Sequence, residues 1–131
     1  MTLTEFLEAR IAEDEEAARW TTEAPWQVVS GEVLSSVSAL NVASHCEGAY
    51  RMLPKDAAHI ARWDPYRVWA ECEAKVQIVA RYKGSEDALN AQPDPLKRMA
   101  AELIVVTLLD VLKALALPYA DHPDYLPEWK L

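Results

Sequence analysis

Apolar side chains recur at helical spacing along three stretches of the chain, residues 3–20, 65–83 and 95–117. Polar and charged residues occupy the other sides of the first two stretches. The first stretch begins with a capping box, in which Thr2 and Glu5 can each bond the other's backbone N–H. The pattern therefore predicts three long helices.

The third of these helices, residues 95–117, has only a narrow polar strip. From residue 103 onward its polar residues are Thr107, Asp110 and Lys113. We expect this helix to be central in the fold. Asp110 is the polar residue of most interest in it, because a buried carboxylate needs a partner. If its own chain does not cover it on all sides, it is a face for homo-oligomerisation.

A sharp bend is predicted at Asp64-Pro65, between helices at 54–63 and 65–83. The residue before a proline is disfavoured in the α region, so one continuous helix is not expected here. The Asp64 carboxylate can cap the second helix, whose first position suits Pro65. Asp94-Pro95 repeats this arrangement at the start of the last helix.

Residues 26–44 contain most of the β-favouring side chains. Strands are expected at 26–30 and 33–38, joined by a tight turn at Gly31-Glu32, with a third at 40–44. So small a sheet must pack on the helices, and Trp26 is the natural anchor.

The remaining segments are a loop at 84–94, which Gly84 starts by ending the preceding helix, and a C-terminal tail at 118–131. The tail has three prolines and three aromatic residues, and we expect it to dock on the helices. The fold class is therefore α+β: a helix-dominated single domain, residues 1–131, with about four helices and a two- to three-stranded antiparallel section after the first helix.

The formal net charge of -8 argues against binding nucleic acid through phosphate contacts. It is compatible with a protein partner that carries a basic patch. The apolar run before Pro118 is too short and too charged to span a membrane, and the chain starts without a secretory signal. We therefore expect a cytoplasmic protein.

The chain has two cysteines and three histidines, but they lack the close pairing of a zinc site. These residues are Cys46, Cys72, His45, His59 and His122. Both thiols are expected to be free, because the cytoplasm is reducing. We expect no metal site and no cofactor.

His59 and Asp56 form the best local pair for acid–base chemistry, because a carboxylate three residues away can orient the imidazole. Such a pair is also common as a surface hydrogen bond. An enzyme or small-ligand site would combine this pair with Glu71 and with His122 and Asp124 of the tail.

Trp20, Trp63 and Tyr66 are the candidate binding residues for a protein partner, since interface centres favour aromatic side chains. The acidic run around Glu13 and Glu16 is interpreted as a solvated helix face. The alternative is that these two carboxylates meet a metal or a basic partner.

Four segments carry a resemblance to a known family: HIARWDPYRVWAECEAK at 59–75, Pro25-Trp26, LPYADHPDY at 117–125 and Glu128-Trp129. They resemble a family of small uncharacterised proteins from actinobacteria and their phages, whose acidic first helix also matches. Members commonly carry His where this chain has Trp63. The resemblance implies a source and no reaction.

Three functions follow from these observations. The first is a protein-interaction or regulatory module, favoured by the small size and by the absence of catalytic spacing. The second is an enzyme or small-ligand binder with its site between the corner at residues 56–71 and the tail. The third is a structural subunit that oligomerises through residues 95–117.

Overall fold

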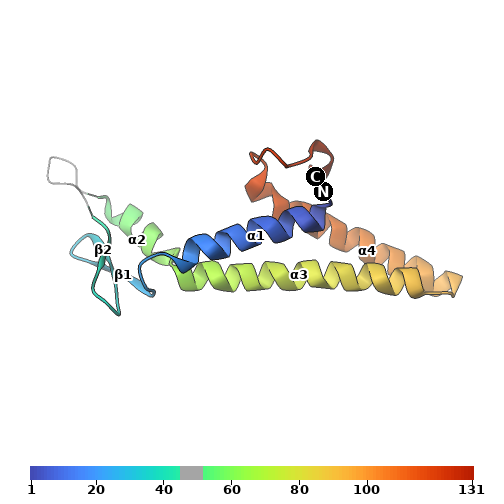
Figure 1. Ribbon diagram of the computed structural model, residues 1–131, viewed down its shortest axis with the longest axis horizontal. Coiled ribbons are helices and arrows are strands. Elements are labelled where there is room, and N and C mark those ends of the chain that lie inside the picture. The colour runs from blue at the N-terminus through green and yellow to red at the C-terminus, as the bar shows by residue number, and fades with distance from the viewer. Residues whose placement is uncertain (45–51) are drawn as a thin grey trace. The chain divides into compact units, whose positions relative to one another are not determined.

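The computed structural model describes residues 1–44 and 52–131 (Figure 1). This part of the chain is α+β and helix-dominated, with a three-stranded antiparallel sheet after the first helix, which confirms the predicted class. In chain order the elements are α1 (Leu3–Arg19), β1 (Trp26–Val29), β2 (Glu32–Ser35), β3 (Asn41–Ala43), α2 (Pro54–Arg62), α3 (Pro65–Ala91), α4 (Pro95–Ala116) and the 3-10 helices η1 (Leu117–Tyr119) and η2 (Pro127–Trp129).

The chain divides into two compact units. Unit 1 comprises Met1–Glu13 and Glu73–Leu131, and unit 2 comprises Asp14–Cys72. Helices α1 and α3 contribute residues to both units. That residues 1–131 form one domain stays a prediction.

The bend at Asp64 is present in unit 2. Helix α2 ends at Arg62, and α3 begins at Pro65. One carboxylate oxygen of Asp64 accepts a hydrogen bond from the Arg67 backbone N–H at 3.0 Å, as predicted for a cap. The other oxygen accepts from the Trp26 backbone N–H at 3.4 Å, so the cap also ties the sheet to the corner.

The turn between β1 and β2 consists of Ser30 and Gly31, one residue earlier than predicted. Glu32 already pairs with Val29 in the sheet. Both turn residues have positive φ, 52° at Ser30 and 83° at Gly31, as a two-residue hairpin turn matched to strand twist requires.

Strand β2 ends at Ser35, before the predicted end at residue 38. The buried hydroxyl of Ser35 accepts hydrogen bonds from the backbone N–H groups of Val37 and Ser38, which form a turn. The sheet packs on α2, as expected of strands that are marginal alone. Trp26 is half-buried, and its indole N–H donates to the Thr22 carbonyl.

The buried core of unit 1 contains residues from α1, α3, α4 and the tail. Its buried apolar residues are Leu3, Phe6, Leu7, Ile11, Val79, Tyr82, Leu112, Ala116, Tyr125 and Trp129. Phe6 contacts the tail directly, with its ring centroid 4.9 Å from that of Trp129 and 6.0 Å from that of Tyr125. The tail is thereby attached to the first helix.

The loop predicted at 84–94 is wrong over residues 84–91, because α3 continues to Ala91. Gly84 lies inside the helix instead of ending it. A single glycine weakens a helix by only about 1 kcal/mol, and the good helix formers that follow offset that cost. The helix ends just before Pro93, which cannot continue it.

The prediction that residues 95–117 form a covered central helix is also wrong. In α4 only Leu112 and Ala116 are buried, and Asp110 is exposed. Asp94 caps this helix as predicted, accepting from the backbone N–H groups of Leu96 and Lys97. Periodicity identified the helix, but its burial depends on how much of the chain packs against it.

Candidate functional site

Helix α4 exposes most of its large apolar side chains. Leu96 is 79% exposed and Leu103 is 69% exposed. We define the outer face of α4 as the exposed large apolar residues of this helix together with Leu117, the residue directly after it. These residues are Leu96, Met99, Leu103, Ile104, Val106, Val111 and Leu117. Thr107 and Asp110, which are also exposed, lie among these residues on the same side of the helix. Exposed apolar side chains in this number mark an interaction surface more often than an ordinary monomer surface.

The spacing of these residues is that of a helix-packing seam. Leu96, Met99, Leu103 and Val106 follow one another at intervals of three and four residues, as in a heptad repeat. The next two positions of the repeat are Asp110 and Lys113, so its apolar part ends at Val106. Leu112 lies on the opposite side and is buried. Helix α4 therefore has two apolar faces, one packed within unit 1 and one directed outward.

An open groove of about 380 Å³ adjoins this surface in unit 1. It is lined by Ala74, Gln77, Ile78, Arg81, Leu108 and Val111, from α3 and α4. Since Val111 also belongs to the outer face of α4, the apolar surface extends from that face toward α3.

Unit 2 has an exposed aromatic surface of its own. Trp20 is 79% exposed, and its indole N–H donates to Glu16 at 2.6 Å. Trp63 and Tyr66 are exposed as well, as a binding role for them requires. Trp69, an apolar residue of the stretch 65–83, is also exposed.

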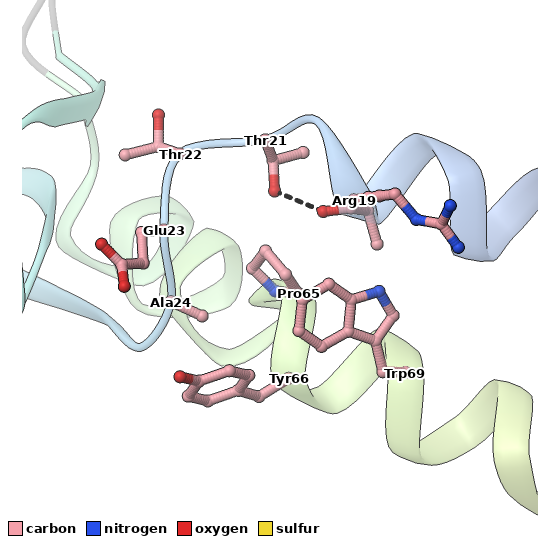
Figure 2. Close-up of a pocket in the computed structure, with 9 residues that line it drawn as sticks. Arg19, Thr21, Thr22, Glu23, Ala24, Pro65, Tyr66 and Trp69 are labelled. Carbon is pink, nitrogen blue, oxygen red and sulfur yellow. Dashed lines mark hydrogen bonds between the residues drawn. The ribbon is translucent and has the colours of Figure 1, made fainter.

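Tyr66 and Trp69 line a pocket of about 240 Å³ in unit 2, together with Pro65 and the segment between α1 and β1 (Figure 2). Their ring centroids are 5.8 Å apart, with 47° between the ring planes. The Thr21 hydroxyl donates to the Ala18 carbonyl at 2.9 Å and fixes the segment opposite the rings.

Three of the predicted site residues lie along one row at the corner of unit 2. The Arg67 guanidinium lies 4.3 Å from the ring centroid of Trp63 and donates to Glu71 at 2.9 Å. The ring of His59 is 6.2 Å from that of Trp63. Among the residues described, Asp56 makes no hydrogen bond to His59, and an acid–base role for this pair stays a prediction.

His122 and Asp124 meet Arg10 in unit 1. Arg10 is only 7% exposed, and one of its terminal nitrogens lies 2.9 Å from Nδ1 of His122. The other terminal nitrogen donates to Glu13 at 2.6 Å. The same Arg10 nitrogen lies 2.7 Å from Nε2 of His122, and the Asp124 backbone N–H donates to Nδ1 at 3.1 Å. His122 therefore anchors the tail to α1.

Sequence reasoning missed Arg10. It lies three and four residues after Leu7 and Phe6, on the apolar side of α1, and an arginine in that position indicates a buried ion pair. His59 belongs to unit 2 and His122 to unit 1, so a site shared by them stays a prediction.

The described residues contain no group of three or more His, Cys, Asp or Glu side chains that could hold a metal ion. Glu13 is paired with Arg10, and Glu16 is paired with Trp20 and Arg19. Cys72 is buried. The predictions for His45 and Cys46 lie outside the described residues.

None of the helices in the described part of the chain is long and apolar enough to cross a membrane. No curated protein and no solved structure shows significant similarity to the sequence. A family model, by contrast, matches residues 1–131, from the acidic first helix to the last residue of the tail. The chain belongs to DUF6221, a family of unknown function.

Proposed function

We propose that this chain is a protein-interaction module that binds another polypeptide through the outer face of α4. The observation that carries the proposal is the exposure of six large apolar side chains on one side of α4 and of Leu117, which directly follows that helix. Together they expose on the order of 700 Å², comparable with the roughly 800 Å² that each partner contributes to a standard interface.

A regulatory role in the cytoplasm of actinobacteria or their phages fits this proposal. It is supported by the sequence motifs at the corner and in the tail and by the acidic composition. The partner is a protein, since the charge of the chain opposes nucleic-acid phosphates.

A second candidate is recognition through the aromatic surface of unit 2. Its support is the pocket beside Tyr66 and Trp69, because aromatic side chains that are exposed in pairs are common interface anchors. Binding by this surface would be lost on Trp69→Ala and unaffected by changes in α4.

Two charge-adding variants test the proposed function. Leu103→Glu places a carboxylate in the middle of the outer face of α4, and Asn90→Glu adds the same charge at an exposed position of α3. Each protein is tagged, incubated with actinobacterial lysate, and also measured alone by light scattering.

We expect wild type and Asn90→Glu to bind one stoichiometric chain, either a foreign protein or a second copy, and Leu103→Glu to lose it. Circular dichroism checks that both variants remain folded. A wild-type protein that stays monomeric at its highest soluble concentration and retains no partner overturns the proposal.

A further inference from the structure

We infer that the pocket between residues 21–24 and the rings of Tyr66 and Trp69 receives an arginine side chain of a partner polypeptide. The inference deepens the second candidate function, on which it rests, and does not depend on the outer face of α4. It is carried by the size of the pocket, by the two exposed rings and by the charge of Glu23.

The size of the pocket suits a single side chain. Its volume of about 240 Å³ lies below the roughly 300–1,000 Å³ that is usual for sites of drug-sized ligands and cofactors. All the residues that line it belong to unit 2. Tyr66 is 52% exposed and Trp69 is 40% exposed, so a side chain from another molecule can reach both rings.

The two rings provide a surface that a guanidinium group prefers. Their centroids are 5.8 Å apart, and the 47° between their planes inclines one ring face to the other. A cation within about 6 Å of a ring centroid is attracted to the ring, and the cation is more often arginine than lysine. The same unit contains an internal example, because the Arg67 guanidinium lies 4.3 Å from the ring centroid of Trp63.

Glu23 provides a negative charge at this pocket. Among the described residues its side chain forms no ion pair and no hydrogen bond. Figure 2 shows its carboxylate and the Tyr66 hydroxyl directed to the same side of the pocket. An arginine side chain lying along the Tyr66 ring would therefore bring its guanidinium toward Glu23.

Arg19 is the only basic residue among the described residues that line the pocket, and its charge is already paired. Its guanidinium lies 3.5 Å from the Glu16 carboxylate, and Figure 2 shows it directed away from Tyr66. The pocket therefore favours a cation, in agreement with the formal net charge of -8. Arginine suits it better than lysine, because a planar guanidinium can stack on a ring and form two parallel bonds to one carboxylate.

Titration of the ¹⁵N-labelled full-length protein with blocked tripeptides tests the ligand. The peptides carry arginine, citrulline or lysine between two glycines. Citrulline has nearly the shape of arginine without its charge, and lysine has the charge without the planar group. Binding is followed at the indole N–H signal of Trp69, identified by its absence in Trp69→Phe, and at the backbone amide signal of Glu23.

We expect both signals to shift with the arginine peptide at millimolar concentration, and the other two peptides to bind at least about threefold more weakly. Glu23→Gln is expected to raise the dissociation constant of the arginine peptide about three- to fivefold. Glu32→Gln is the matched control, because it removes one charge from β2 in the same unit, outside the pocket. The dispersion of the spectra shows whether each variant is folded.

Equal affinities for the arginine and citrulline peptides overturn the inference, as do equal losses in Glu23→Gln and Glu32→Gln or the absence of any shift at Trp69 and Glu23. A lysate partner that both Trp69→Ala and Glu23→Gln lose supports it. If Trp69→Ala loses the partner but Glu23→Gln retains it, recognition by this surface stands and arginine as its ligand fails.

Discussion

Nη1 of Arg10 lies 2.9 Å from Nδ1 of His122, and this contact joins the first helix to the C-terminal tail. The guanidinium also lies 5.3 Å from the ring centroid of Phe6 and bonds Glu13 through its other end. The two terminal nitrogens of this buried guanidinium are hydrogen-bonded, whereas its Nε has no partner among the described residues. Loss of the side chain therefore removes both of these contacts and the packing on Phe6 at once.

We expect Arg10→Ala to lower the free energy of unfolding by roughly 2–4 kcal/mol, because it removes charge-assisted hydrogen bonds and packing from a buried site. Urea unfolding followed by circular dichroism measures the change. Arg19→Ala is the control: its salt bridge to Glu16 is exposed, and we expect a loss of less than about 1 kcal/mol. Equal losses in the two variants would show that Arg10 does not hold the tail.

Because of Tyr82, the stability of the folded protein depends on pH in the alkaline range. Burial, followed by the hydrogen bond to Glu86, raises the pKa of Tyr82 from 10.0 to about 12. Between these values the unfolded chain releases a proton that the folded protein retains. The stability that protonated Tyr82 gives the folded protein is therefore fully present below pH 10. As the pH rises toward 12 this stability is lost, and the free energy of unfolding falls by roughly 2–3 kcal/mol.

Absorbance of the phenolate near 295 nm measures this titration, and Tyr82→Phe identifies the Tyr82 component by removing it. Glu86→Gln is expected to lower the pKa of Tyr82 only part of the way toward 10.0, since burial is the larger cause. A phenolate that forms at the ordinary pH in the folded wild type would contradict burial of Tyr82.

Gly84→Ala is expected to stabilise the protein by about 0.5–1 kcal/mol. Gly84 lies within α3, and a Cβ atom added there meets nothing within 4 Å. Alanine has the higher helix propensity and lowers the entropy of the unfolded chain. Thermal unfolding provides the measurement.

The matched substitution Gly31→Ala is expected to destabilise, because Gly31 has a φ of +83°. If Gly84→Ala destabilised instead, Gly84 would be a helix-terminating residue, and the loop interpretation of residues 84–94 would be restored.

Asp94→Ala removes the cap of α4 and is expected to lower the free energy of unfolding by about 1 kcal/mol. Asp94→Asn keeps an acceptor for the same backbone N–H groups and is expected to retain most of the stability. Both are measured by urea unfolding. An equal loss in the two variants would indicate that the negative charge at the helix N-terminus matters more than the hydrogen bonds.

The sequence was sufficient for the features that depend on neighbouring residues. The caps at Asp64 and Asp94, the bend before Pro65 and the capping box at Thr2 each require only a few consecutive side chains and backbone groups. The end of α3 was predicted too early, at Gly84, because a glycine can either end a helix or be tolerated inside one, and the local sequence does not distinguish these cases.

By itself the sequence determined where the helices begin, the hairpin after the first helix and the two apolar faces of α4, because periodicity and capping are local. Only the tertiary structure decided which of those faces is covered and that Arg10 meets His122. Burial depends on which distant segments come together: one side of α4 finds partners in its own unit, and the other does not. The periodic pattern is the same on both sides, so it could not tell a packed face from an exposed one.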